Sequence, residues 1–303
     1  MATKVPAHAT RATGPRRISD RDVRARLTLR RRCRIVAAVI AIARYVALGD
    51  SSTEGLDDPD GEGGYRGWAD RFAERIAEHH PALAYANLAV RGRTTREIRE
   101  QQLPPARAMR PDVATVVAGM NDLLRGGFDP RAIADDLGAM QAALRADGAF
   151  VISFTIPDLA HRLFVGPVAR RMSARTQALN VELRAVSAAT GAHLIDLAAH
   201  AITADPRMWS RDRLHASPAG HARVAEALAH AIGLPDATDA WRAPLPPAPP
   251  TPPAARLREH AAWMRDYFAP WVWRRARGRT TGDGRAAKRP TLAPVRHPGA
   301  RHR

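Results

Sequence analysis

A chain of 303 residues, 45% of them hydrophobic, is long enough to bury one substantial core or two small ones, which excludes a wholly disordered protein. Its single cysteine, Cys33, excludes a fold that depends on an intrachain disulfide, so we expect a cytoplasmic protein. The net charge of +17 belongs to the ends, because residues 1–43 carry 11 Lys/Arg against 2 Asp/Glu and residues 254–303 carry 13 against 3. Specific nucleic-acid binding is therefore excluded as the central function, while the basic termini leave open a weak contact with an anionic membrane or polyanion.

The N-terminal region, residues 1–43, lacks sustained apolar periodicity, and we expect a basic, disordered extension that the fold does not require. Within it, the apolar run 35–43 follows three arginines and imitates a secretory signal with a cleavage site after Ala43. The run is short, the basic region before it is very long, and a predicted strand follows at once. We therefore favour a cytoplasmic location over export.

From Arg44 onwards, short apolar runs alternate with segments of helical periodicity. Strands that alternate with helices predict an α/β protein with a parallel sheet covered on both faces. The order of the strands within the sheet cannot be read from the sequence. The predicted strands are 45–48, 84–89, 113–118, 150–154 and 193–197. The predicted helices are 68–78, 95–102, 130–146, 168–190 and 218–232.

Composition divides the chain after this pattern ends. We expect an α/β domain over 44–234, a stiff proline-rich linker over 235–253, and a C-terminal amphipathic helix with a basic tail over 254–303. The helix is predicted over 254–268, and the residues from Arg274 onwards are predicted to be disordered.

The C-terminal helix carries one apolar face and several further aromatic residues. We expect it to pack back on the α/β domain, with attachment to an anionic membrane as the alternative. The predicted apolar face consists of Leu257, Ala261, Met264 and Phe268, whereas Trp263, Tyr267 and Trp271 lie off this face.

The most informative stretch is 45–55, where an apolar run stops at Gly49-Asp50-Ser51. A buried strand that ends in this way delivers a hydroxyl to the sheet edge at which ligands of open α/β folds bind. Ser51 is therefore a candidate nucleophile. A serine hydroxyl needs a base, a group that orients the base, and donors for the oxyanion.

Three later sites meet these needs. Gly92 lies at the turn after the second predicted strand, where a backbone N–H is free to point at a ligand. Asn121 follows the third strand and offers a side-chain amide donor. Asp212 and His215 lie in the loop before the last predicted helix, and their three-residue offset allows Asp212 to orient the imidazole while His215 takes the proton.

With these blocks in this order, the chain resembles the GDSL-type, or SGNH, serine hydrolases over about residues 44–232. The first block is matched by 49–51, the second by Gly92, the third by 119–122 and the fifth by 212–215. The resemblance implies a three-layer α/β/α sandwich with a parallel, flavodoxin-like, five-stranded sheet. It also implies a serine esterase or lipase-like hydrolase that acts on carboxylic ester bonds.

The resemblance assigns a role to each matched residue. Ser51 would be the nucleophile, His215 the general base and Asp212 the third member of the triad. The oxyanion hole would be formed by the N–H groups of Ser51 and Gly92 and the amide of Asn121. Ser52 stands where the family name has leucine, which leaves the subfamily open.

Structural alternatives exist for each site. Ser51 could cap the first helix, Asn121 and Gly92 could serve turns, and His215 could be an ordinary loop histidine. For two further histidines we favour the structural interpretation: His221 is expected to be structural and His161 to lie in a solvated loop. An acidic loop is expected to be a solvated rim without a bound cation; its members are Asp57, Asp58, Asp60 and Glu62.

The sequence has neither a phosphate-binding Gly-Lys-Ser/Thr loop nor a dinucleotide fingerprint after the first strand, so we expect chemistry without a cofactor or metal. The substrate stays open among lipid esters, acetylated sugars and thioesters. Arg91, Arg93 and Arg125 lie near the expected oxyanion donors and would either favour an acidic substrate or be solvated. The alternative function is that of a surface- or polyanion-binding protein that acts through its basic termini. Oligomeric state is not readable from the sequence.

Overall fold

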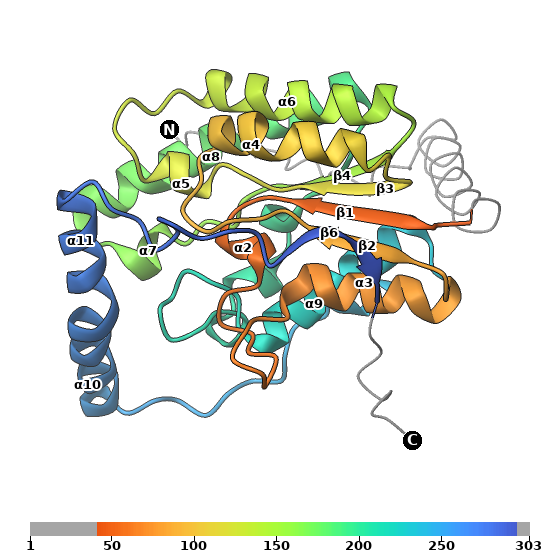
Figure 1. Cartoon of the computed structure of the whole chain (residues 1–303). Helices are drawn as coiled ribbons and strands as arrows, with labels where there is room; N and C mark the ends of the chain where they lie inside the picture. Colours follow the sequence, from red (N-terminus) through yellow and green to blue (C-terminus); the bar gives the residue numbers. More distant parts are fainter. Residues whose placement is uncertain (1–40, 296–303) are drawn as a thin grey trace, which may run out of the picture.

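The computed structural model describes residues 41–295 and is built around one six-stranded sheet with the order β5-β4-β3-β1-β2-β6 (Figure 1). Strands β1 to β5 are parallel to their neighbours, and β6 is antiparallel to β2. The parallel part has the flavodoxin-like order, with its topological switch between β1 and β3. The strands are β1 (Arg44–Leu48), β2 (Ala84–Asn87), β3 (Val113–Val116), β4 (Phe150–Phe154), β5 (His193–Ile195) and β6 (Arg289–Pro294).

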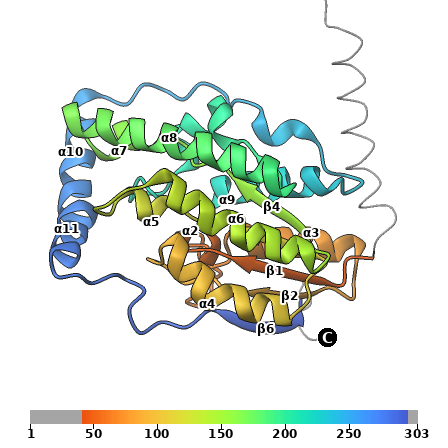
Figure 2. The same cartoon turned by 90° about the horizontal axis from the view of Figure 1, so that it is seen from above.

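Helices cover both faces of the sheet, which confirms the predicted three-layer α/β/α sandwich (Figures 1 and 2). One face is covered by α4 (Thr95–Ala108), α6 (Pro130–Ala146) and α8 (Gly166–Thr190), and the other by α3 (Gly67–His79) and α9 (Pro218–Ile232). Three single-turn helices stand near the carboxyl ends of strands: α2 (Ser51–Glu54), α5 (Met120–Leu123) and α7 (Ala160–Leu163). Short 3-10 turns follow β5 and α9: η1 (Leu197–Ala199), η2 (Ala201–Ala204), η3 (Pro206–Met208) and η4 (Asp239–Arg242).

The central strand β1 is buried on both faces, as the apolar run predicts for a strand inside a doubly covered sheet. The ring of Tyr45 stacks on Tyr85 with centroids 5.0 Å apart and meets the edge of Phe72 at 5.1 Å. These contacts hold the amino-terminal part of β1 in the core.

The sixth strand, β6, corrects two predictions. The sheet has six strands rather than five, and the chain after Arg274 is not disordered throughout, because β6 pairs with β2 in the register Ala84↔Pro294 and Asn87↔Arg289. Before it, Lys288 Nζ donates to the carbonyls of Tyr65 and Arg66 at 2.8 and 2.9 Å. Sequence reasoning missed the strand because its two prolines and lone leucine give no period-2 pattern, a composition tolerated only at a sheet edge.

The C-terminal helical region runs from α10 (Pro253–Trp263) through a π-helical turn, η5 (Met264–Phe268), into α11 (Ala269–Ala276). It stands at the carboxyl ends of the parallel strands (Figure 1). The predicted buried face is wrong, because Leu257 is 70% exposed whereas Trp263 is only 5% exposed. Helix α10 buries the Trp263 indole against the body of the molecule rather than a full apolar stripe.

The start of the described chain also differs from the prediction. Ile42 is 2% exposed, its N–H donates to His80 Nδ1 at 3.3 Å, and the N–H of Ala43 donates to Asp112 Oδ2 at 2.9 Å. The fold therefore uses residues that we assigned to a dispensable extension. The rest of that extension, including most of the signal-like run 35–43, lies outside the described residues. Over 41–295, no helix combines the length and the apolar character needed to cross a bilayer.

Two boundaries extend beyond their predictions. Helix α4 continues to Ala108 because Pro104 and Pro105 lie on its exposed side, where the carbonyls they leave unpaired can face water. The predicted linker begins with packed structure, since Trp241 is 8% exposed and its ring meets His200 at 4.8 Å.

Candidate active site

The turn after β1 places Ser51 at the first position of α2. Gly49 is needed there, because a Cβ atom on it would lie 2.1 Å from Thr53 Oγ1 and 2.8 Å from the carbonyl of Val117. The N-cap is Asp50, whose Oδ1 accepts the N–H of Ser52 at 3.1 Å. The alternative that Ser51 itself caps the helix is therefore wrong, and its hydroxyl is free for another partner.

That partner is His215, whose Nε2 lies 2.8 Å from Ser51 Oγ. The other ring nitrogen, Nδ1, lies 2.5 Å from Asp212 Oδ2. Asp212 folds back on its own loop, as its spacing predicts, because Oδ1 accepts the N–H groups of Leu214 at 2.9 Å and His215 at 3.0 Å. The three side chains form a continuous chain of hydrogen bonds from carboxylate to hydroxyl, with Asp212 holding the imidazole in place.

The electrostatics of this group favour a basic imidazole. Burial lowers the pKa of His215, but the hydrogen bond to Asp212 and its charge outweigh burial, so the pKa of His215 is raised above its ordinary value. Burial raises the pKa of Asp212, and the hydrogen bond and charge of His215 oppose it and bring the pKa down to about 2. At neutral pH Asp212 is therefore ionised beside the ring.

The acidic loop after α2 is only in part the solvated rim that we expected, because Asp60 and Glu62 are exposed but Asp57 and Asp58 are not. Asp58 is 1% exposed, binds Arg71 Nε at 2.7 Å and accepts the N–H of Gly67 at 3.0 Å. Asp57 contacts the hydroxyl of Ser210, which also lies 2.6 Å from Asp212 Oδ1. Asp57 is thus linked to the Asp212 side chain through Ser210, while Asp58 holds the start of α3.

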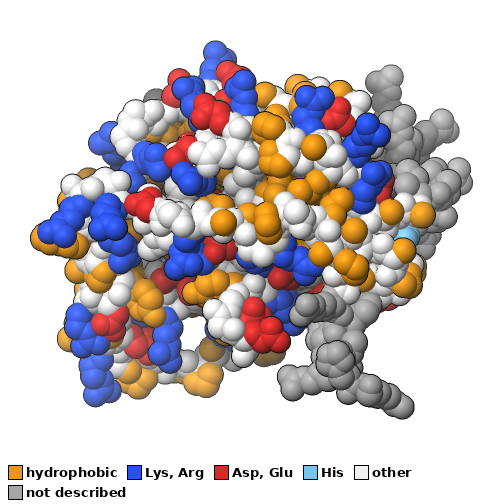
Figure 3. Space-filling model, viewed as in Figure 1, with side chains coloured by type: hydrophobic (Ala, Val, Ile, Leu, Met, Phe, Trp, Pro, Cys, Tyr) orange, Lys and Arg blue, Asp and Glu red, His pale blue; other side chains and the backbone are white. Residues whose placement is uncertain are grey.

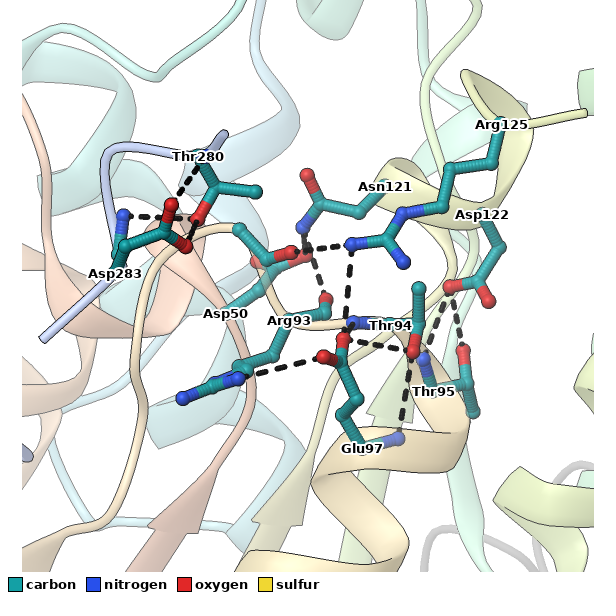
Figure 4. Close-up of polar contacts among 12 residues, drawn as sticks. Asp50, Arg93, Thr94, Thr95, Glu97, Asn121, Asp122, Arg125, Thr280 and Asp283 are labelled. Atoms are coloured by element: carbon teal, nitrogen blue, oxygen red, sulfur yellow. Dashed lines mark hydrogen bonds and ion pairs between the residues drawn. The ribbon is translucent and has the colours of Figure 1, made fainter. Parts of the chain in front are cut away.

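The amide of Asn121 lies beside the turn that carries Ser51. Its Nδ2 donates to Asp50 Oδ2 at 2.9 Å and to the carbonyl of Arg93 at 3.0 Å, so it joins the turn after β1 to the loop after β2 (Figure 4). Gly92, in that loop, has a φ of 81°, which strains any residue with a side chain. The structure therefore brings Ser51, Gly92 and Asn121 together with Asp212 and His215 at one end of the sheet.

Asp50 has a further property. Burial raises its pKa to about 6, with the hydrogen bond from Ser52 N–H and the charge of His215 acting in the opposite direction. Asp50 is therefore a second group at this site, besides His215, that titrates near neutrality.

Two contacts at the site were not predictable from sequence. Glu54, at the end of α2, accepts the N–H of Arg91 at 2.9 Å and pairs with its guanidinium, which fixes the Gly92 loop against the Ser51 helix. Trp263 Nε1 donates to the carbonyl of Asp212 at 2.9 Å, and the guanidinium of Arg213 lies 4.5 Å from its ring. The partners in each pair are separated by 37 or more residues, and no local pattern signals such a pairing.

The expected structural histidine, His221, is fully buried and does not contact Ser51. Its Nδ1 accepts the N–H of Trp68 at 3.0 Å, and its Nε2 donates to the carbonyl of Leu56 at 3.0 Å. Burial lowers its pKa to about 4. The ring is thus a neutral bridge between α9 and the start of α3. His161 is exposed, as expected, although it lies on α7 rather than in a loop.

A metal site at this position is not supported by the contacts. Asp57, Asp212 and His215 offer ligand atoms within 4.8 Å of one another. However, both ring nitrogens of His215 already face protein partners, so a metal would have to displace Asp212 or Ser51.

A doubly covered parallel sheet with serine, histidine and aspartate in hydrogen-bond contact at its carboxyl edge has the form of a hydrolase that acts on ester bonds. The family model for the GDSL-like Lipase/Acylhydrolase family matches residues 47–223, more than half of the chain, and the chain belongs to this family. The expected family and the ester-hydrolase class are confirmed. The match ends within α9, so α10, α11 and β6 lie beyond it.

Solved structures show the same fold at low identity. A lipase/acylhydrolase from Enterococcus faecalis has a TM-score of 0.52 and 24% identity, covering 63% of this chain and 95% of that one. The lipase Lip_vut3 from a goat rumen metagenome has a TM-score of 0.51 and 21% identity, covering 64% of this chain and 99% of that one. The esterase EstA from Pseudoalteromonas sp. has a TM-score of 0.50 and 18% identity, covering 63% of this chain and 96% of that one. A search of curated protein sequences finds no match.

Proposed function

We propose that this hydrolase cleaves carboxylic esters through an acyl-enzyme on Ser51, with thioesters and acetyl esters as further substrates of the same chemistry. The observation that carries the proposal is the 2.8 Å contact between Ser51 Oγ and His215 Nε2, with Nδ1 of the same ring held by Asp212. A nucleophile in contact with a base that is itself oriented by a carboxylate is the arrangement that activates a serine hydroxyl.

In the first half of the reaction, Ser51 Oγ attacks the carbonyl carbon while its proton passes to His215 Nε2. The carbon–oxygen bond to the alcohol then breaks, and the alcohol leaves with that proton. In the second half, water gives a proton to His215 and attacks the acyl-enzyme, and Ser51 recovers the proton as the acid is released. The ionised Asp212 stabilises the imidazolium formed in each half.

The negative charge on the substrate oxygen requires donors. We assign this role to the N–H groups of Ser51 and Gly92 and to the amide of Asn121. Supporting this assignment, Asn121 Nδ2 is held between the residue before Ser51 and the residue after Gly92. One of these two hydrogen bonds would be exchanged for the oxyanion when substrate binds.

Labelling with a fluorophosphonate probe tests the proposal, because the probe reacts with an activated serine. We expect the full chain to be labelled, Ser51→Ala to be unlabelled and inactive on 4-nitrophenyl butyrate, and Ser52→Ala to keep both properties. Ser52 is a matched control, since it is adjacent and its hydroxyl faces Trp68 Nε1 at 3.3 Å. Wild-type activity in Ser51→Ala would overturn the mechanism.

We also propose that the enzyme works in the cytoplasm without removal of residues 1–43. Cleavage after Ala43 would delete Ile42, a 2% exposed core residue, together with the two N–H bonds that precede β1. Intact-mass measurement of the native protein is the test, and a mass that begins at Arg44 would contradict it.

A second candidate function, attachment to an anionic membrane, is favoured by the outer surface of α10 and α11. Leu257 is 70% and Trp273 60% exposed there, among arginines that Figure 3 shows over this end of the molecule. Co-sedimentation with phosphatidylglycerol vesicles tests it. We expect the double variant Leu257→Glu/Trp273→Glu to bind these vesicles less than the unmodified chain does. Equal binding would show that α10 and α11 do not attach the protein to the membrane.

A further inference from the structure

Two guanidinium groups, those of Arg93 and Arg125, gather beside the Gly92 loop and share one carboxylate. Arg125 Nη2 donates to the carbonyl of Gly92 at 3.3 Å and lies 3.7 Å from Glu97 Oε2 (Figure 4). Arg93 Nη1 lies 3.3 Å from Glu97 Oε1. The same carboxylate already accepts the N–H and hydroxyl of Thr94 at 2.7 and 2.9 Å. Among the described residues, Glu97 is the only carboxylate at ion-pair distance from Arg93 and Arg125, while Asp122 and Asp283 act on them from farther away.

The C-terminal helix α11 brings a third arginine to this place. Arg275 Nη2 donates to the carbonyl of Leu124, the residue before Arg125, at 2.6 Å. Within residues 41–295, Arg275 has no carboxylate partner at ion-pair distance, and its other contact is the ring of Trp271 at 5.7 Å. Burial and then the charge of Arg125 lower the pKa of Arg275, as expected for two like charges that face each other.

The acid that the C-terminal segment brings near Arg93 is Asp283, whose charge acts on Arg93 although it is not at ion-pair distance. Asp283 accepts the N–H and hydroxyl of Thr280 at 2.9 and 2.6 Å, in a turn that lies against Gly92 (Figure 4). Moreover, Arg93 Nε is buried without a hydrogen-bond partner among the described residues. An unpaired buried donor is costly, so the protein does not fully satisfy the Arg93 guanidinium.

Arg91 shows what a neutralised arginine looks like in the same loop. Its side chain is 8% exposed and pairs with Glu54 through several contacts. The sequence suggested Arg91, Arg93 and Arg125 for an acidic substrate. Because Glu54 neutralises Arg91, the candidates are now Arg93, Arg125 and Arg275.

We infer that Arg93, Arg125 and Arg275 bind an anionic group of the ester, a carboxylate or a phosphate, beside the bond that is cleaved. This inference rests on the proposed function of Ser51 and names the substrate class of the same site. Guanidinium groups match the planar, bidentate geometry of carboxylates and phosphates. Arg125 Nη2 contacts the carbonyl of Gly92, so the anion would bind close to the proposed oxyanion donors. Arg93 and Arg125 lie within the residues that the family model matches, whereas Arg275 lies beyond them.

The test compares neutral and anionic esters in matched pairs, at constant ionic strength. The first pair, 4-nitrophenyl butyrate and mono-4-nitrophenyl glutarate, places the carboxylate in the acyl group. The second pair, phenyl acetate and 4-acetoxybenzoate, places it in the leaving group. The readout is the ratio of kcat/KM for the anionic ester to that for the neutral ester, so a general loss of activity cancels.

We expect the unmodified chain to prefer the anionic member of one pair, and the pair that responds identifies the side of the ester that carries the charge. Arg275→Gln and Arg125→Gln should each reduce the ratio by about tenfold, the size of one charge-assisted hydrogen bond. Arg277→Gln is the matched control, because it removes the same charge from the end of α11 but its guanidinium lies 3.9 Å from the Trp273 ring. It should keep the ratio.

Salt provides a measurement that needs no variant, because 500 mM NaCl should lower the ratio of the unmodified chain relative to 50 mM. Hydrolysis of the neutral esters without an anionic preference in either pair, or an unchanged ratio in both Arg275→Gln and Arg125→Gln, would overturn this inference and leave the proposed function standing. If none of the four esters is hydrolysed, the proposed function fails and the inference fails with it.

Discussion

Asn121 Nδ2 donates to Asp50 Oδ2 at 2.9 Å, which ties the turn after β3 to the residue that immediately precedes Ser51. Because this bond holds the amide where charge would develop, we expect Asn121→Ala to lower kcat by about 10²- to 10³-fold with little change in KM. Steady-state hydrolysis of 4-nitrophenyl butyrate measures both constants. A loss confined to KM would show that Asn121 binds substrate without stabilising the oxyanion.

The pH dependence of kcat/KM should report His215. The protonated ring cannot accept the Ser51 proton, so activity falls as pH drops through the pKa of His215, and the raised pKa places this acid limb above 6.5. In Asp212→Asn the raising effect is lost while burial persists, so the limb should move to lower pH and activity should fall strongly.

Asp50 titrates in a neighbouring range, because burial raises its pKa to about 6. Profiles between pH 5 and 9 for the unmodified chain, Asp50→Asn and Asp212→Asn separate the two groups. If the acid limb of the pH profile moves in Asp50→Asn but not in Asp212→Asn, the limb belongs to Asp50, which would contradict the role of His215.

The buried ring of His221 should make the fold sensitive to acid. Its pKa is 6.5 in the unfolded chain and about 4 in the folded one, so the unfolded chain binds the extra proton between these values. The contribution of this ring is therefore complete above pH 6.5 and is lost as pH falls towards 4, by about 3 kcal/mol at most.

His221→Gln tests this effect, because glutamine keeps one donor for Leu56 and one acceptor for Trp68. Urea unfolding followed by circular dichroism at pH 7 and pH 5 should show a smaller loss of unfolding free energy in the variant than in the unmodified chain. Equal losses would mean that other groups account for the acid sensitivity.

Trp263 should contribute to stability through its indole N–H. Trp263→Phe removes the donor to the carbonyl of Asp212, and we expect a loss of about 1 kcal/mol in unfolding free energy, the usual size of one hydrogen bond. Trp273→Phe is the control, since that ring is 60% exposed and should change the value by less than about 0.5 kcal/mol. Losses of the same size in both variants would show that the bond contributes nothing specific.

The α/β sandwich was predictable because its signals are local. A strand is indicated by an apolar run that stops at Gly49 or before Gly119, and helix α9 is indicated by its cap residue Ser217. Each of these signals lies within a few residues of the element that it predicts. The grouping of Ser51 with Gly92 and Asn121 also followed, because parallel strands present their carboxyl ends at one edge, whereas the pairing of Ser51 with His215 came from the family resemblance.

What sequence could not supply was long-range pairing. Glu54 finds Arg91 and β6 finds β2 through tertiary contacts that no periodicity encodes. On α10, apolar spacing suggested Leu257 as a buried residue, but the position of the helix on the molecule selected Trp263 instead. In the acidic loop, charge suggested exposure, and the partner Arg71 buried Asp58.

The pairing of β6 with β2 joins segments that are separated by about 200 residues. A ribosome makes Ser51, Asp212 and His215 well before Arg275 and β6, so a nascent chain can assemble the hydrogen-bonded trio while the outer edge of β2 is still bare. Only when Arg289–Pro294 closes that edge is α11 held between two anchored segments. With the roles that we propose, a nascent chain would acquire the reactive serine before it acquires the arginine that selects the substrate.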